Sequence, residues 1–135
     1  MEMIDYYNTS LVTLNIGRDL NLGNDRYDLP SSTPGPRTFE AAMAGATQLY
    51  FLNGFEIADY FEPGKEILVF DHPEEVLEAV ERMNRNPDES SAIGFAAQRR
   101  ALAEHTYAHR AAKILQHCGF ELASVSAATI SDARG

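Results

Sequence analysis

The sequence predicts an α/β fold built around a parallel β-sheet. Short apolar runs alternate with segments of helical periodicity through the first half of the chain, which is typical of strand–helix–strand units. Three amphipathic helical segments then follow one another. At 135 residues the chain forms one domain, large enough to bury a core without disulfides or metal. We expect three or four mainly parallel strands flanked by helices, followed by a C-terminal run of three helices.

Three segments are predicted as strands, at residues 10–16, 47–52 and 66–70. The first is mostly apolar, as expected for a strand that is buried on both faces. Parallel strands are joined by right-handed crossovers, usually through a helix. We therefore expect a helix in each of the two connections.

Both connections carry a helical pattern. The first helix is predicted over residues 37–44, after a long polar loop, and it ends at Gly45, a residue type that commonly closes helices. The second is short, over residues 55–61, and stops at Pro63 and Gly64.

The first C-terminal helix begins at Asp71 or His72, with Pro73 in its first turn. Its apolar stripe is expected to be buried and consists of Val76, Leu77, Val80 and Met83.

The second C-terminal helix has a capping-box arrangement at its start. Asn86 is the expected N-cap, with Pro87 at the first helical position and Glu89 at the third. Its apolar side is weak, with Ile93 and Leu102 among alanines. We therefore expect this helix to pack shallowly.

The third C-terminal helix spans residues 106–118 and ends at Gly119. Its expected core stripe consists of Tyr107, Ala111, Ile114, Leu115 and Cys118. Cys118 is the only cysteine, which excludes an internal disulfide and suggests a packed thiol in a reducing cytoplasm. His105 and His109 lack the further ligands of a zinc site, so we interpret them as structural.

Three parallel strands make only half of a doubly wound, Rossmann-like sheet. Residues 120–125 could add a short fourth strand, and the remaining residues are expected to be disordered. We expect a partial domain over residues 1–120 and a tail over residues 121–135. The first strand is left with an open edge. The chain is therefore expected to form a homo-oligomer or to complete its sheet with an N-terminal domain.

The composition argues against several partners. Eleven basic and twenty acidic residues give a net charge of −9, and this field repels nucleic acids and anionic membranes. No apolar run approaches the roughly 20 residues of a membrane span, and the N-terminus lacks the basic and apolar regions of a signal peptide. We expect a cytoplasmic protein whose phosphate-binding site, if present, is locally basic.

Polar and charged side chains follow the predicted strands at their carboxyl ends, where open α/β sheets bind ligands. Asn15 and Arg18 follow the first strand, and Glu56 follows the second. Arg37 and Glu40 lie three residues apart on the first turns of a helix, whose N-terminus favours an anion. Arg37 and the helix end could hold phosphate while Glu40 binds sugar hydroxyls. The alternative is an ordinary solvated surface pair.

Several motifs occur in the order and spacing of a known family. They are Tyr7-Asn8-Thr9-Ser10, Leu14-Asn15-Ile16 with Arg18, Arg37-Thr38-Phe39-Glu40-Ala41-Ala42 with Gly45-Ala46, Glu56 before Tyr60-Phe61-Glu62-Pro63-Gly64-Lys65-Glu66, and Leu102-Ala103-Glu104-His105-Thr106-Tyr107-Ala108-His109-Arg110. Over residues 7–115 the chain resembles the C-terminal part of group 1 glycosyltransferases, specifically the CgeB-like branch. The resemblance implies a GT-B enzyme, which binds a nucleotide-sugar between two Rossmann-type domains, with the nucleotide held by the C-terminal one.

The resemblance also implies roles for individual residues. In the family two glutamates lie eight positions apart, and Glu40 matches the second, which binds the ribose. The first would fall at Ser32, so the sugar-contacting glutamate has no counterpart there. Asn15 and Arg18 match positions expected to contact phosphate or base. Glu56 matches a glutamate facing the cleft, with stabilisation of its own helix start as the alternative.

We therefore interpret the chain as the nucleotide-sugar-binding part of a glycosyltransferase, which moves a sugar from a nucleotide diphosphate donor to an unknown acceptor. The residues indicate no catalytic base and no cofactor. The resemblance implies no metal, because the family neutralises the diphosphate with basic side chains and helix ends. Without its N-terminal domain the chain is expected to be inactive. The alternative is a non-catalytic Rossmann-like module for dimerisation or partner docking.

Overall fold

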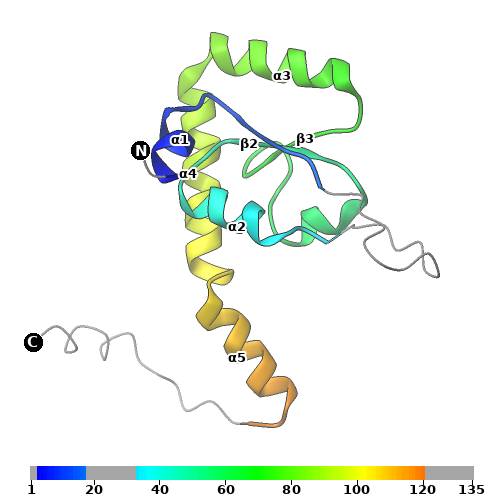
Figure 1. Ribbon diagram of the computed structural model, residues 1–135, viewed down its shortest axis with the longest axis vertical. Helices are drawn as coiled ribbons and strands as arrows, with labels where there is room; N and C mark the ends of the chain where they lie inside the picture. The colour runs from blue at the N-terminus through cyan, green and yellow to red at the C-terminus, as the bar shows by residue number, and fades with distance from the viewer. Residues whose placement is uncertain (1–2, 18–32, 121–135) are drawn as a thin grey trace, which may run out of the picture. The chain divides into compact units, whose positions relative to one another are not determined.

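The computed structural model describes residues 3–17 and 33–120 (Figure 1). The chain divides into two compact units, Met1–Ala103 and Glu104–Gly135. The first unit contains the sheet and the helices that cover it, and the second contains the last helix of the described residues.

The first unit is built on a three-stranded parallel sheet (Figure 1). The strands are β1 (Thr13–Asn15), β2 (Gln48–Phe51) and β3 (Leu68–Phe70), in the order β1-β2-β3. Leu14 pairs with Leu49 in the register, and Tyr50 pairs with Val69. The predicted α/β class and the parallel sheet are confirmed, although each strand is shorter than the apolar run that predicts it.

Each crossover carries a helix in its described residues, as the sequence predicts. Helix α2 (Pro36–Met43) joins β1 to β2, and the 3-10 helix η1 (Phe55–Asp59) joins β2 to β3. Gly45 follows α2 with a φ of +79°. This left-handed conformation favours glycine, so the predicted end of the helix is confirmed.

The two faces of the sheet carry separate apolar clusters, because successive strand side chains point to opposite faces. One cluster joins β2 to α2, η1 and the second half of α4 (Pro87–Glu104), and it comprises Phe39, Ala42, Tyr50, Ile57, Phe61, Ile67, Ala97 and Ala101. The other joins the sheet to α3 (Pro73–Arg85) and the first half of α4, and it comprises Leu49, Leu68, Phe70, Met83 and Ile93. Helix α4 therefore contributes to both cores.

The predicted shallow packing of α4 is wrong. Its small residues let the helix approach the sheet closely, and Ile93, Ala97 and Ala101 are buried. A Cβ atom on Gly94 would lie 2.2 Å from the carbonyl oxygen of Gly45, in the turn between α2 and β2. An alanine-rich face here indicates close contact and not weak packing.

Asn86 connects α3 to α4 without the predicted capping box. Its backbone N–H donates to the Arg82 carbonyl oxygen at 3.0 Å and so continues α3. That N–H is therefore not available to the Glu89 side chain. Instead, the Asn86 side-chain amide donates to Glu89 Oε2 at 3.2 Å, and Glu89 Oε1 accepts from Arg82. The predicted start of α4 at Pro87 is confirmed.

Helix α3 buries less of its stripe than predicted. His72 is its N-cap, as expected, and Met83 is buried. Val76 and Val80 are half-buried, whereas Leu77 is 69% exposed. Leu77 lies roughly 100° around the helix from Val76, which places it outside the buried face.

The N-terminal segment adds a helix that has no counterpart among the predicted elements, α1 (Met3–Thr9). Strand β1 then lies at one edge of the sheet. Leu14 and Ile16 are 50% and 59% exposed. The described part of the chain thus leaves the predicted open edge at β1.

The second unit contains α5 (Tyr107–His117). Thr106 is the N-cap, and its N–H donates to His109 Nδ1 at 3.3 Å, which agrees with the structural interpretation of this histidine. No residue of α5 is buried, and Cys118 is exposed, so the predicted core stripe and packed thiol are wrong. A helical stripe becomes core only where another element covers it. The predicted tail over residues 121–135 lies outside the described residues.

Candidate functional site

A cavity of about 290 Å³ lies at the carboxyl end of β1, beside the start of α2. It is lined by Asn15, Ile16, Gly17, Thr33, Gly35, Pro36, Arg37, Thr38 and Tyr50. These residues come from the end of β1, the start of α2 and the middle of β2. Ligands of α/β sheets gather at such strand ends, so this cavity is the candidate site.

The start of α2 suits an anion. Gly35 is the N-cap and supplies no side-chain hydrogen bond, and Pro36 at the first position has no N–H. The N–H of Arg37 therefore has no side-chain cap and adds to the positive end of the helix dipole. The exposed guanidinium of Arg37 contributes a full positive charge at the same place. A phosphate or carboxylate group would be stabilised here.

Arg37 and Glu40 lie on the exposed face of α2, while the residues between them, Thr38 and Phe39, are buried. Neither Arg37 nor Glu40 forms an ion pair with another described residue. Both side chains are exposed. Arg37 lines the cavity, and Glu40 lies one turn further along the helix.

Asn15 ties the end of β1 to the start of α2. Its Nδ2 donates to Thr38 Oγ1 and to Gln48 Oε1, both at 3.0 Å. The Gln48 amide in turn donates to the Thr38 carbonyl oxygen at 2.9 Å, and all three residues are buried. Because both N–H groups of Asn15 are used, a ligand can be contacted only by its oxygen, Oδ1.

Tyr50 lines the cavity and is not among the predicted site residues. It is 4% exposed and pairs with Asn15 in the strand register. Burial raises the pKa of the Tyr50 hydroxyl, and the nearby Glu56 carboxylate raises it further. The sequence signal that could have found Tyr50 is the alternation along β2, which places it on the same face as the buried Gln48.

Glu56 is exposed at the start of η1 and does not line the cavity. The chain reaches it through Gly54, whose φ of +103° is a conformation that favours glycine. Glu56 nevertheless lies close enough for its charge to affect Tyr50. It therefore belongs to the surroundings of the site.

The structure thus places Asn15 and Arg37 around one cavity, with Glu40 and Glu56 beside it. Arg18 lies outside the described residues. Within residues 3–17 and 33–120, no three His, Cys, Asp or Glu side chains come together as a metal site requires.

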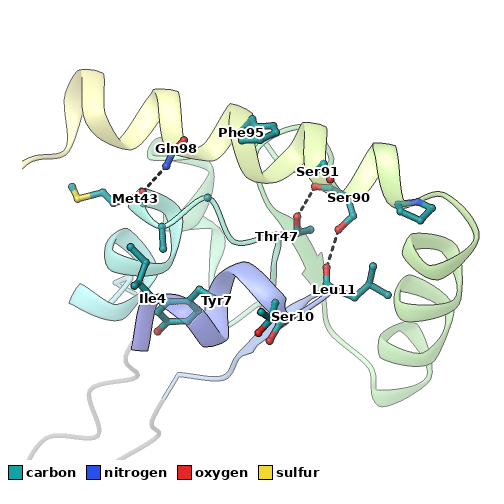
Figure 2. Close-up of a pocket in the computed structure, with 14 residues that line it drawn as sticks. Ile4, Tyr7, Ser10, Leu11, Met43, Thr47, Ser90, Ser91, Phe95 and Gln98 are labelled. Atoms are coloured by element: carbon teal, nitrogen blue, oxygen red, sulfur yellow. Dashed lines mark hydrogen bonds between the residues drawn. The ribbon is translucent and has the colours of Figure 1, made fainter. Parts of the chain in front are cut away.

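A second cavity, of about 540 Å³, lies before the amino ends of β1 and β2. Figure 2 shows how segments around it are joined: Thr47 Oγ1 donates to the Ser90 carbonyl oxygen, Ser90 Oγ to the Leu11 carbonyl oxygen, and Gln98 to the Met43 carbonyl oxygen. None of the described residues that line it is charged. This cavity therefore does not suit a diphosphate, although it is the larger of the two.

One family pattern covers most of the chain. It is described as glycosyl transferase-like and matches residues 1–116. The chain belongs to this family. No curated protein and no solved structure gives a significant match.

Membership of the glycosyl transferase-like family assigns a glycosyltransferase-type function and implies a nucleotide-sugar as the partner. The positive end of α2 and the adjoining carboxylate of Glu40 are compatible with such a ligand. In the part of the chain that the structure describes, no helix is long and apolar enough to cross a membrane.

Proposed function

We propose that this chain is the nucleotide-sugar-binding part of a CgeB-like glycosyltransferase of the GT-B type. Residues 1–120 form part of its C-terminal Rossmann-like domain, and residues 121–135 form a tail. The complete enzyme works in the cytoplasm and transfers a sugar from a nucleotide diphosphate donor to an acceptor.

One observation carries the proposal. A cavity at a strand end and a helix start without a side-chain cap occur together at α2. Arg37 and Glu40 lie in the first turns of this helix, and neither forms an ion pair within the described part of the chain. Arg37 and the helix end bind the diphosphate, and Glu40 accepts hydrogen bonds from the ribose hydroxyls. Asn15 contributes its oxygen at the floor of the site, and Glu56 adds a carboxylate at the rim.

The chemistry that these groups supply is leaving-group stabilisation. When the bond between sugar and diphosphate breaks, negative charge grows on the departing phosphate oxygens. Donors that are already oriented toward that charge lower the barrier without having to reorganise. The catalytic base and the acceptor site belong to the N-terminal domain, so this chain alone is inactive.

Calorimetric titration of the chain with uridine, guanosine and thymidine diphosphate tests the binding part of the proposal. We expect weak binding, in the high-micromolar to millimolar range, because only one side of the cleft is present. Glu40→Ala should weaken the best nucleotide by roughly tenfold or more and leave inorganic pyrophosphate unchanged. Glu78→Ala, at an exposed position of α3, is the matched control. Equal losses for nucleotide and pyrophosphate would contradict the ribose role.

A second candidate function, partner docking or dimerisation, is favoured by the open edge of β1. An edge strand offers unpaired backbone groups to a further strand. The exposed Leu14 lies on β1, and the exposed Ile16 follows its last residue. We propose that the chain self-associates there as a symmetric dimer. Leu14→Lys should then yield monomers in sedimentation equilibrium, whereas Leu77→Lys on α3 should not. A monomer over roughly a tenfold range of wild-type concentration would refute the proposal.

A further inference from the structure

Gln48 is a buried polar side chain that lines neither of the two cavities described above. It is 1% exposed. Its Nε2 donates to the Thr38 carbonyl oxygen at 2.9 Å, and its Oε1 accepts from Asn15 Nδ2 at 3.0 Å. Burying an amide is costly unless both of its ends are paired. Gln48 meets this condition by joining β2 to the start of α2 and to the end of β1.

These partners fix the direction of both side-chain amides. The Thr38 carbonyl oxygen can only accept a hydrogen bond, so the nitrogen of Gln48 must face it and the oxygen of Gln48 must face Asn15. Asn15 must then present its own nitrogen to Gln48. Turning the Asn15 amide over would set two acceptors, Asn15 Oδ1 and Gln48 Oε1, against each other at a buried position. A backbone carbonyl of α2 thereby determines the orientation of the Asn15 side chain.

This orientation leaves one polar group of the Asn15 side chain for a ligand. The second N–H of Nδ2 donates to Thr38 Oγ1 at 3.0 Å, so both donors are engaged. Oδ1 forms no hydrogen bond with a described residue, and no buried polar side-chain atom of the described residues lacks a partner. Oδ1 is therefore accessible, and Asn15 lines the cavity at the end of β1. At Asn15 the side chain thus offers the cavity an acceptor and no donor.

An acceptor discriminates between the parts of a nucleotide diphosphate. Ionised phosphate oxygens only accept hydrogen bonds, so Asn15 Oδ1 has no favourable contact with them. The ribose hydroxyls and the base N–H groups are donors, and either can pair with Oδ1. The family resemblance left phosphate and base open as partners of Asn15, and the orientation of its amide argues against phosphate.

We propose that Asn15 binds a neutral donor of the nucleotide, an O–H or N–H group, and that Gln48 is the positioning residue that keeps Asn15 Oδ1 available for it. The inference rests on the proposed function, since it takes a nucleotide to occupy the cavity. Asn15 accepts the hydrogen bond from the ligand, and Gln48 acts only through Asn15.

Two variants separate this positioning role from simple support of the fold. Gln48→Met removes the amide, so the Asn15 amide can turn over, accept from the Thr38 hydroxyl and present its nitrogen to the cavity. Thr38→Val removes the other acceptor of Asn15, which lies at the same distance of 3.0 Å, but leaves Gln48 to hold the orientation. Both variants lose buried hydrogen bonds, and only Gln48→Met should change the preference between ligands.

Calorimetric titration of the full chain with uridine diphosphate and inorganic pyrophosphate measures this preference. Asn15→Ala should weaken uridine diphosphate by roughly threefold to tenfold, the effect of one neutral hydrogen bond, and leave pyrophosphate unchanged. Gln48→Met should weaken uridine diphosphate to a similar extent without weakening pyrophosphate, whereas Thr38→Val should keep the wild-type ratio of the two affinities. Equal losses for both ligands in Gln48→Met would overturn the positioning role.

Three analogues of uridine diphosphate identify the donor. The 2′-deoxy, 3′-deoxy and N3-methyl analogues each lack one O–H or N–H group of the parent compound. The analogue that lacks the recognised donor should bind equally to the wild type and to Asn15→Ala, while the other two should still lose affinity. Full sensitivity of all three analogues to Asn15→Ala would overturn the contact with a donor.

Hydrogen exchange followed by NMR tests the amide orientation in the free chain, without any ligand. Both side-chain amide protons of Asn15 should exchange slowly with water in the wild type, because they face Thr38 and Gln48, and faster in Gln48→Met. The exposed Asn84 is the reference for rapid exchange. Rapid exchange at Asn15 in the wild type would overturn the role of Gln48 and leave the nucleotide site intact. Slow exchange together with failure of every nucleotide diphosphate to bind would instead overturn the proposed function and the ligand contact. Should Gln48→Met fail to fold, the exchange measured in the wild type still decides the orientation.

Discussion

Gly94→Ala should destabilise the protein, against the intrinsic preference of a helix. In an unhindered helix interior this change stabilises by about 1 kcal/mol. Here the new Cβ would lie 2.2 Å from the carbonyl oxygen of Gly45, far inside the 3.4 Å at which ordinary contact begins. It would also lie 3.1 Å from the Gly45 carbonyl carbon and 3.2 Å from Thr47 Oγ1. Both clashing groups at Gly45 are backbone, so no side-chain rotation relieves the overlap.

The turn between α2 and β2 must therefore move away from α4 by about 1 Å. Overpacking of this kind costs about 1–3 kcal/mol. The movement also strains the hydrogen bond from Thr47 to the Ser90 carbonyl oxygen, whose length is 2.5 Å. Weakening this buried bond adds about 1 kcal/mol. We expect a net loss of about 2–4 kcal/mol in the free energy of unfolding.

Urea denaturation followed by far-ultraviolet circular dichroism measures this loss. Ser91→Ala, at an exposed position of the same helix, should change the free energy by no more than about 0.5 kcal/mol. A Gly94→Ala protein as stable as the wild type, or more stable, would show that α4 does not approach the turn as closely as described. Loss of stability would confirm that small residues hold α4 against the sheet.

Three further changes test the site and its supports. In an active glycosyltransferase that contains this chain, Arg37→Lys should lower turnover by roughly 10- to 1000-fold because the planar multi-donor group is lost, while Arg99→Lys on α4 should have no effect. Wild-type turnover of Arg37→Lys would count against a role in leaving-group stabilisation. Asn15→Ala should cost about 1–3 kcal/mol in urea denaturation because it removes the donor to Thr38 and Gln48, and the exposed Asn84→Ala is its control. The backbone N–H groups of Asp71 and His72 hold the pKa of Glu75 below its ordinary value. This carboxylate therefore stabilises the start of α3 at neutral pH, and the stabilisation is lost as the pH falls through the lowered pKa. Glu75→Gln should therefore flatten the fall in the urea midpoint on acidification, unlike Glu74→Gln; an unchanged pH profile would contradict the assignment.

The elements that the sequence predicted correctly depend on short-range signals. Pro36 and Gly45 bound α2 through backbone conformations that belong to each residue alone. His72 caps α3 for a similarly local reason. The capping box at Asn86 was mispredicted because its N–H has a competing acceptor in the preceding helix, on Arg82.

The errors in burial have a different origin. A periodic stripe indicates which face of a helix is apolar, but not whether another element covers it. No residue of the α5 stripe is buried, and Cys118 is exposed. In α4, by contrast, the face that carries Ala97 and Ala101 is buried. Side-chain size predicted weak packing for α4, yet it is small size that permits close approach.

By itself, the sequence determined the α/β class, the strand–helix order and the placement of Arg37 and Glu40 on one helical face, because each follows from spacing along the chain. Only the tertiary structure decided what surrounds these residues. In the fold, Asn15 donates hydrogen bonds to Thr38 and Gln48, so both of its amide N–H groups are engaged. Tyr50 lines the cavity, and the Glu56 carboxylate contributes to its raised pKa. These contacts bring together residues from β1, α2, β2 and η1. Local periodicity does not encode such contacts, because they depend on how the crossovers place separate elements beside one another.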